Sequence, residues 1–291
     1  MADSQAVASL RTGSVLLCLC ALFLFSALDA TAKHLSAFLA VPLLVWARYL
    51  VHLLIMVLTI LPSQGRGIVL TRRPWLMGLR GVTLAGVTLL GQLALYTLPL
   101  AETTALVFVA PLLVALLAGP LLGEQVRLRT WLATGAGFAG VLLIARPAGN
   151  LAGAGVACAL GAALCYAAYQ ILTRKLVATE PPMRLLFYTA LLGTLVMSPV
   201  VPVFWDGRLP SFGQGLLVVS LGVYGGLGHL LLIRAFRETP ASLLSPLLYL
   251  QLVWATLLGW LVFDHLPDLP AIVGMLIIGA SGLSLAIGRQ K

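Results

Sequence analysis

The residues of this chain that could do chemistry are a few polar side chains inside long apolar runs. Asp29 and Arg48 lie in the first two runs, and Glu102 begins the fourth. A charge at the centre of a bilayer costs from about 2.5 to more than 10 kcal/mol, so each one needs a partner or a function. We predict an ion pair between Asp29 and Arg48, which either holds two helices together or borders a cavity and opens with its gate. Glu102 either lies among lipid headgroups or binds a cationic ligand or a proton.

Uncharged polar side chains lie deeper in the runs. Gln92 and His229 have similar surroundings, "LGQLAL" and "LGHLLL", and Gln170 and Gln251 lie in two further runs. Amide and imidazole groups can recognise the polar atoms of a ligand without the cost of a full charge. Hydrogen bonding between neighbouring helices is the alternative role of each.

Aromatic residues in the runs outnumber those needed at two membrane interfaces. Several can line a cavity for a planar or cationic ligand, although packing or interface anchoring also explains any single one. This set includes Trp46, Phe108, Tyr166, Tyr169, Tyr224 and Tyr249. The candidate substrate-binding residues are Gln92, Tyr96, Gln170, Tyr188, His229, Gln251 and Trp254, and the candidate gating or coupling residues are Asp29, Arg48 and Glu102.

The runs themselves predict a helical membrane protein. The chain has 291 residues, of which 60% are hydrophobic and 9% are charged, whereas soluble proteins have about 25% charged residues. Membrane barrels alternate polar and apolar residues along each strand, and these runs are continuous. About 20 apolar residues in a helix cross a bilayer. The predicted spans are 13–33, 41–62, 75–97, 101–122, 130–147, 153–173, 184–204, 213–233, 240–262 and 269–288.

Basic residues predict the orientation of these spans. With the N-terminus in the cytoplasm, 14 of the 18 Lys and Arg residues lie on the cytoplasmic side, as the positive-inside rule requires. Both chain ends are then cytoplasmic. The net charge of +9 is explained by topology and by contact with anionic lipid, so we expect the lipid bilayer and no nucleic acid as a partner.

The second half of the chain resembles the first at an offset of 140 residues. Tyr96 then aligns with Phe236, Ala101 with Ala241, and Glu124 with Asp264. Five spans per half is an odd number, so the halves, residues 1–147 and 148–291, enter the membrane in opposite directions and enclose a central cavity. Glu124 and Asp264, at the ends of equivalent spans, are expected to stabilise the N-terminus of the helix that follows each.

The stretch "ALYTLPLAETTALVFVAPLLVALLAGPLLGE" (94–124), followed by "TGAGFAGVLLIARP" (134–147), resembles an EamA-type module of the drug/metabolite transporter superfamily. The second copy departs from the pattern, because Gln251 replaces the proline at 111 and Phe-Asp replaces Gly-Glu. The resemblance implies ten helices around a central cavity, with the fifth and tenth packed outside it, in a bacterial cytoplasmic membrane. It leaves the substrate open, since the superfamily moves amino acids, polyamines, vitamins, nucleotide-like metabolites and cationic drugs.

We therefore predict a secondary transporter that exports a small organic metabolite, such as an amino acid or amine, by alternating access. Import of a vitamin, nucleoside-like or sulfonium metabolite is the alternative, and either proton coupling or uncoupled exchange is allowed. An intramembrane enzyme is not expected, because the serine of "GASG" (279–282) has no evident base. The four cysteines lack zinc-type spacing, so no metal or cofactor is expected. The glycines within residues 135–140 and 274–282 predict close helix packing, which could extend to a homodimer.

Overall fold

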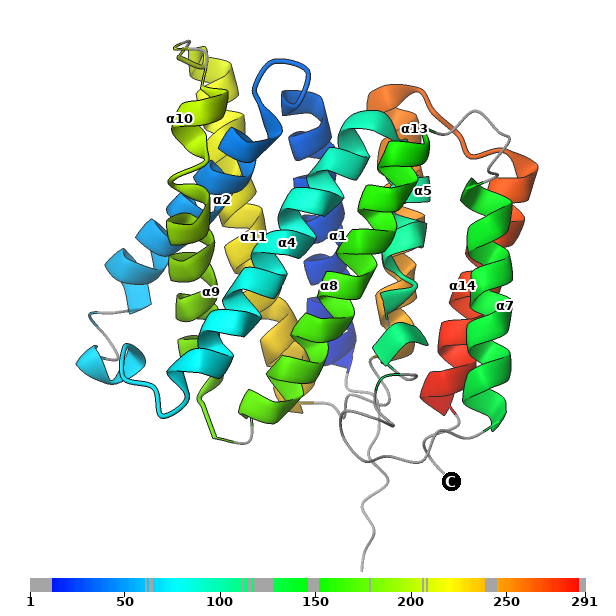
Figure 1. Ribbon diagram of the computed structural model, residues 1–291, viewed down its shortest axis with the longest axis horizontal. Coiled ribbons are helices and arrows are strands. Elements are labelled where there is room, and N and C mark those ends of the chain that lie inside the picture. The colour runs from blue at the N-terminus through cyan, green and yellow to red at the C-terminus, as the bar shows by residue number, and fades with distance from the viewer. Residues whose placement is uncertain are drawn as a thin grey trace, which may run out of the picture.

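The computed structural model describes residues 12–60, 62, 65–110, 112–114, 117, 128–145, 152–177, 179–205, 207, 209–238 and 245–287. This part of the chain is helical and contains no β-strand (Figure 1). The helices of the first half are α1 (Thr12–Leu35), α2 (Val41–Ile55) with a π-helical turn η1 (Met56–Ile60), η2 (Gly65–Ile68), α4 (Pro74–Thr97), α5 (Leu100–Val107) and α7 (Leu128–Ala145). The second half has α8 (Gly153–Val177), α9 (Pro182–Met197), α10 (Val201–Phe204), α11 (Phe212–Glu238), η3 (Ser245–Leu250), α13 (Gln251–Phe263) and α14 (Leu269–Ile287).

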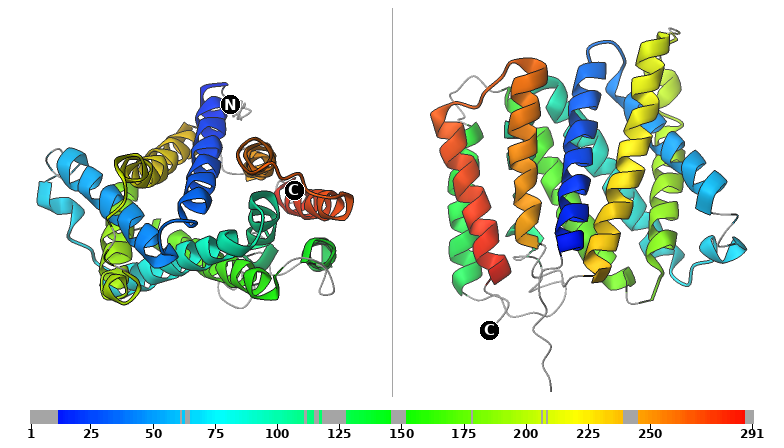
Figure 2. Two further views of the ribbon diagram at one scale, coloured as in Figure 1. Left: turned by 90° about the horizontal axis from the view of Figure 1, so that it is seen from above. Right: turned by 180° about the vertical axis from the view of Figure 1, so that it is seen from behind.

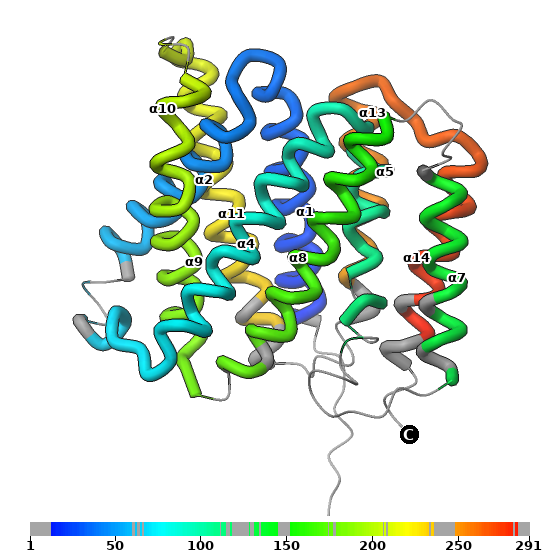
Figure 3. The backbone as a smooth tube through the Cα atoms, viewed as in Figure 1, coloured from blue at the N-terminus to red at the C-terminus, as the bar shows by residue number. Residues whose placement is uncertain are grey.

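Helices long and apolar enough to cross a bilayer occur in both halves. Five such segments are described: Gly13–Leu35, Val41–Thr59, Pro74–Thr97, Gly153–Thr173 and Phe212–Leu232. Shorter apolar helices occupy the other predicted spans. The start of α1 and the end of α14 lie at one end of the bundle, which we call the terminal end, and the other is the far end (Figures 1 and 3). The predicted fourth span differs from expectation, because α5 ends at Val107. The next two residues, Phe108 and Val109, form a turn.

The helices of the two halves pack against each other in pairs. α1 packs on α11, α4 on α8, α2 on α9, and α5 on α13. Seen along the bundle, α7 and α14 form a separate pair at one side (Figure 2). Every one of these pairs joins an element before residue 147 to an element after it.

Small residues allow the α7–α14 pair to pack closely. A Cβ atom added at Gly140 would lie 2.8 Å from the carbonyl oxygen of Gly274, and one added at Gly274 would lie 2.6 Å from that of Gly140. Backbone therefore meets backbone at this crossing, and a side chain on either residue would separate the helices. These two glycines serve packing within the chain.

The carboxylate that caps α14 is Asp268, which corrects the expectation for Asp264. Asp268 Oδ1 accepts a hydrogen bond from the N–H of Ala271 at 3.1 Å, which satisfies a donor at the positive end of α14. Asp264 instead ends α13 in the left-handed conformation, with a φ of 53°. Glu124, its predicted equivalent, lies outside the described residues.

Candidate binding cavity

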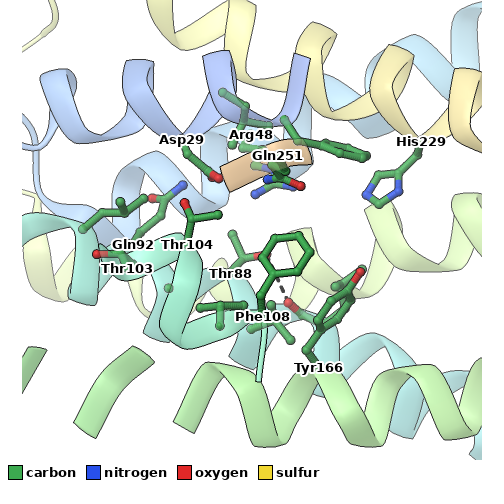
Figure 4. A pocket seen from close by; sticks show the side chains of 17 residues that line it. Asp29, Arg48, Thr88, Gln92, Thr103, Thr104, Phe108, Tyr166, His229 and Gln251 are labelled. Atoms are coloured by element: carbon green, nitrogen blue, oxygen red, sulfur yellow. Dashed lines mark hydrogen bonds between the residues drawn. The ribbon is translucent and has the colours of Figure 1, made fainter. Parts of the chain in front are cut away.

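A cavity of about 170 Å³ opens among helices from both halves of the chain (Figure 4). α1, α2, α4 and α5 line it from the first half, and α8, α11 and α13 line it from the second. Its lining residues are Phe25, Leu28, Asp29, Arg48, Leu84, Val87, Thr88, Gly91, Gln92, Leu95, Thr103, Thr104, Val107, Phe108, Tyr166, His229 and Gln251. Eight of these 17 residues have polar or charged side chains and the rest are mainly apolar, and small-molecule sites combine both kinds.

Asp29 and Arg48 line this cavity but do not form the predicted ion pair. No hydrogen bond or ion pair joins the two side chains, although they are close enough to interact electrostatically. The guanidinium of Arg48 lies beside α11, where a Cβ atom added at Gly225 would be 3.4 Å from its Nε. It also lies over the ring of Tyr49, 5.7 Å from the ring centre. The two charges therefore face a common space while each lacks a direct partner of opposite charge.

Gln92 presents an unsatisfied amide to the cavity. Gln92 is 5% exposed, and neither its Nε2 nor its Oε1 has a hydrogen-bond partner within the described chain. The neighbouring hydroxyls of Thr103 and Thr104 donate to the carbonyl oxygens of Pro99 and Leu100, both at 2.8 Å. Each threonine oxygen therefore keeps acceptor capacity for a donor in the cavity.

His229 and Gln251 bring polar groups of the second half to the same space. The imidazole of His229 packs edge-on against Phe25, with ring centres 4.9 Å apart. Figure 4 shows Gln92 and His229 on opposite sides of the cavity, with Arg48 and Gln251 between them. Gln92 and His229, matched by sequence surroundings, thus line one cavity from the two halves.

Four predicted binding residues lie outside the lining. Tyr96 is 60% exposed on α4. The hydroxyl of Tyr188 donates to the carbonyl oxygen of Val69 at 2.7 Å, and Trp254 packs edge-on against Phe23 with ring centres 5.2 Å apart. Gln170 is partly buried on α8 and is not among the lining residues. The sequence identified these side chains as intramembrane polar or aromatic groups, but it did not define the face of each helix.

Glu102 lies at the far end, where it joins the two halves. His265, in the α13–α14 connection, lies with its Nε2 3.1 Å from Oε1 of Glu102, while Oε2 has no partner among the described residues. Lys33 interacts electrostatically with Glu102. Its Nζ donates to the carbonyl oxygens of Leu95 and Leu98 at 2.5 and 2.6 Å. The positive charge of Lys33 at these carbonyl oxygens interacts favourably with the negative, C-terminal end of α4. Glu102 is therefore an interhelical contact at one edge of the bundle.

Arg80, which is one of the 14 Lys and Arg residues predicted on the cytoplasmic side, is a buried charge. It is 3% exposed, and its guanidinium donates to Thr173 Oγ1 at 2.8 Å, to Leu185 O at 3.0 Å and to Thr189 Oγ1 at 2.9 Å. A fourth bond reaches the hydroxyl of Tyr169 at 2.7 Å. The position of Arg80, six residues after Pro74 and inside a predicted span, was the signal that it enters the bundle. It ties α4 to α8 and α9.

A buried carboxylate fastens a connection at the terminal end. Glu180 Oε1 accepts from the hydroxyl of Thr71 at 2.6 Å and from the N–H of Arg72 at 3.0 Å, and Oε2 accepts from Arg184. Burial raises the pKa of Glu180, but the hydrogen bonds from Thr71, Arg184 and Arg72 outweigh burial, so its pKa is lowered. Arg184 also donates to Gly67 O at 2.6 Å. This cluster, the Glu180 clasp, holds the connection before α4 against that between α8 and α9.

The described residues contain no group of three or more His, Cys, Asp or Glu side chains suited to a metal ion. The cavity polar groups are instead a carboxylate, a guanidinium, an imidazole, two amides and three threonine hydroxyls, with Phe25, Phe108 and Tyr166 as aromatic neighbours. Such a set can bind a small polar organic molecule through charge, hydrogen bonds and ring contacts.

Comparison with known proteins places this cavity in context. The EamA-like transporter family matches residues 12–146 and again 153–286. The S-adenosylmethionine uptake transporter of Rickettsia prowazekii is 27% identical over 237 residues, covering 81% of this chain and 80% of the relative. The pseudopaline exporter CntI of Pseudomonas aeruginosa is 29% identical over 292 residues, covering 98% and 99%. The riboflavin transporter of Vibrio cholerae is 29% identical over 198 residues, covering 66% and 62%.

A solved structure has a similar fold. It is described as "Crystal structure of protein", has a TM-score of 0.68 and 23% sequence identity, and covers 97% of this chain and 100% of its own.

Proposed function

The chain belongs to the EamA-like transporter family of the drug/metabolite transporter superfamily, and from this premise we propose that it is a secondary transporter. It moves a small organic metabolite, such as an amino acid, an amine or a related compound, across the bacterial cytoplasmic membrane by alternating access. The observation that carries the proposal is the cavity, because helices from both matched segments supply its polar groups. No enzymatic step is needed for this function.

The proposed architecture is ten membrane helices in two inverted repeats of five. The helix contacts support it. The counterparts of α1, α2, α4, α5 and α7 in the second half are α8, α9, α11, α13 and α14, and exchanging each helix with its counterpart preserves the pairing. The α1–α11 contact becomes α8–α4, α2–α11 becomes α9–α4, and α1–α13 becomes α8–α5, and all of these contacts are present. The pairs α2–α9, α5–α13 and α7–α14 exchange with themselves. A two-fold relation of this kind is the usual basis of rocking between two access states.

The terminal end is proposed to face the cytoplasm. The supporting feature is the concentration of Lys and Arg in the connections at this end, which matches the positive-inside rule. The Glu180 clasp then lies on the cytoplasmic side and the Glu102–His265 contact on the outer side. Asp29, Arg48 and Glu102 are the proposed gating or coupling residues. Either proton coupling or uncoupled exchange is compatible with this proposal.

Two directions of transport have support from relatives. Export is favoured by the resemblance to the pseudopaline exporter, which extends over 98% of this chain. Import is the second candidate, because the S-adenosylmethionine relatives are uptake transporters. The substrates named for three relatives, S-adenosylmethionine, pseudopaline and riboflavin, are small metabolites, which supports the same broad class of substrate here.

Flux in proteoliposomes tests the proposal. Purified protein is reconstituted and a panel of labelled amino acids, amines, vitamins and nucleoside-like compounds is measured with and without a pH gradient, against protein-free liposomes. We expect saturable flux of at least one compound, and an effect of the pH gradient would indicate proton coupling. Absence of flux for every compound, together with hydrolysis of a lipid or peptide, would favour an intramembrane enzyme instead. Metabolites released by overexpressing and deleted cells would decide between export and import.

A further inference from the structure

The charges that face the cavity are opposite in sign and separately unsatisfied. Asp29 on α1 and Arg48 on α2 both line it, and neither makes a hydrogen bond or an ion pair in the described part of the chain. Charges in a low-dielectric interior are costly unless they are paired and hydrogen-bonded. A ligand that meets both charges at once would remove the cost of both.

The other charges near the cavity are already engaged. The guanidinium of Arg80 makes four hydrogen bonds to α8 and α9. Lys33 bonds to two carbonyl oxygens at the end of α4, and Glu102, which contacts His265, is not among the lining residues. Asp29 and Arg48 are thus the charged side chains available to a ligand among the described residues that line the cavity. One negative and one positive group require a ligand with one positive and one negative group.

The geometry of the two groups indicates which ligand group each would meet. A guanidinium presents two parallel N–H donors to a carboxylate, and such bidentate pairs are among the stronger hydrogen bonds in proteins. A carboxylate accepts well from an ammonium group. Arg48 is therefore the partner of a ligand carboxylate, and Asp29 is the partner of a ligand ammonium.

Gln92 supports the same assignment from the side of Asp29. Its buried amide has both a donor and an acceptor without a partner, so it can donate to a carboxylate and accept from an ammonium group. Figure 4 shows Asp29, Gln92 and Thr104 together on one side of the cavity. Thr104 keeps an acceptor position, because its hydrogen is used by Leu100 O. This side of the cavity can complete the hydrogen bonding of a charged head group.

The remaining wall suits a planar or apolar side chain. Phe108 and Tyr166 line it, and the ring of Phe108 packs near Tyr249 with ring centres 5.5 Å apart. The volume of about 170 Å³ is below the roughly 300–1,000 Å³ of sites for drug-sized ligands. The space therefore fits a ligand of amino-acid size.

We infer that this cavity binds the zwitterionic head group of an α-amino acid, with the carboxylate on Arg48 and the ammonium on Asp29, and a planar side chain against Phe108 and Tyr166. The inference rests on the proposed transport function and adds the required head group. It excludes compounds that carry only the amine or only the acid. The ligand takes the place of the Asp29–Arg48 ion pair, because it bridges the two residues that do not bond to each other.

Matched compounds test the inference in the unmodified protein. The probes are phenylalanine, phenethylamine and phenylpropionate, and histidine, histamine and imidazolepropionate, so that each amino acid is compared with itself lacking one charge. Flux in proteoliposomes and thermal stabilisation of the purified protein are both measured. We expect each amino acid to act at concentrations at least about tenfold below its two analogues, the loss expected for one charge-assisted hydrogen bond.

Two variants assign the charges. Asp29→Asn is expected to reduce the preference for the amino acid over the acid, and Arg48→Gln to reduce the preference for the amino acid over the amine. If either residue had only a structural role, its variant would lower the flux of all three compounds of a set, and the stabilisation by them, equally. That result would overturn the assignment. Size-exclusion profiles check that both variants fold. The test on the unmodified protein stands even if a variant does not fold.

The outcomes separate this inference from the proposed function. Equal activity of the amine or the acid in a protein that transports would overturn the inference and leave transport standing. Stabilisation by the amino acids without any flux would overturn transport and leave the binding site standing. Neither flux nor stabilisation by either amino acid would overturn the inference, whereas transport would be overturned only by absence of flux for every compound of the larger panel.

Discussion

Two arginines within the membrane helices have opposite surroundings. Arg80 donates four hydrogen bonds to α8 and α9, and its guanidinium lies 4.5 Å from the centre of the Tyr169 ring. Arg48 lines the cavity with its guanidinium beside Gly225 and makes no hydrogen bond to the described chain. Arg80 is buried with its hydrogen-bond partners within the protein, whereas Arg48 is partly buried and has no hydrogen-bond partner in the described chain.

The difference separates a structural charge from a functional one. Two of the acceptors of Arg80 are prepared by the chain, because Thr173 and Thr189 donate their own hydrogens to Tyr169 O and Leu185 O. Their oxygens are thereby oriented to accept from Arg80. No such shell surrounds Arg48, which retains its hydrogen-bonding capacity for a molecule in the cavity. A buried polar group with complete partners stabilises a fold, and one without them indicates a binding role.

The largest expected effect is the loss of Arg80. Arg80→Leu removes four hydrogen bonds that join three helices, and we expect a loss of about 2–4 kcal/mol in stability. The yield of monodisperse protein and its melting temperature in detergent would both fall. Arg80→Lys keeps the charge but loses the planar fork, so its effect should be intermediate. If Arg80→Leu has the same melting temperature as the wild type, the distinction between the two arginines is wrong.

Arg48→Gln is expected to affect transport and not folding. Removal of a charge-assisted bond to the ligand should reduce transport by about tenfold or more. The melting temperature without ligand should remain within about 1–2 °C of the wild type, since Arg48 makes no hydrogen bond or ion pair within the described chain and contributes only a ring contact with Tyr49 and an electrostatic interaction with Asp29. Flux and melting curves on the same preparation check both statements. A lower melting temperature with unchanged flux would make Arg48 a second structural arginine.

The sequence predicted the membrane class and most helix positions, because long apolar runs are a strong signal that depends on composition alone. Gln92 and His229, which have similar surroundings in the sequence, also line one cavity. The sequence did not distinguish Arg80 from the surface bases, because the distinction depends on Thr173, Leu185 and Thr189, about 90–110 residues away. Nor did it separate Gln92 from Gln170, since helices that are apolar on every side give no sign of which face meets the cavity.

These two amides give the next prediction. Gln92→Leu removes a buried amide without partners, so we expect stability to rise by about 1 kcal/mol while transport falls. Gln170→Leu is the matched control, because Gln170 lies outside the lining and should change neither quantity substantially. Melting temperature and flux are measured for both variants. A stability loss in Gln92→Leu would mean that the amide is bonded within the protein, and would place Gln92 with Arg80.

The smallest expected effect concerns Glu180, a satisfied carboxylate that extends the contrast to the terminal end. Its pKa is lowered from 4.5, because its hydrogen bonds outweigh burial. A carboxylate with a lowered pKa in the folded state stabilises the protein fully above the unfolded pKa and loses this effect as pH falls through the folded pKa. The Glu180 clasp should therefore contribute a constant stability above about pH 4.5 and progressively less below it.

Comparison of the wild type with Glu180→Gln isolates this contribution from other acid effects. We expect the variant to melt about 1–3 °C lower at pH 6–7, and the difference to close as the pH falls below 4.5. Asp264→Asn, at an exposed carboxylate, is the control for replacing a carboxylate by its amide elsewhere in the chain. A difference that persists unchanged into acid would show that the clasp depends on the shape of the side chain. A difference that widens would mean that Glu180 is stabilised in its protonated form, because the sign of the pKa shift would then be reversed.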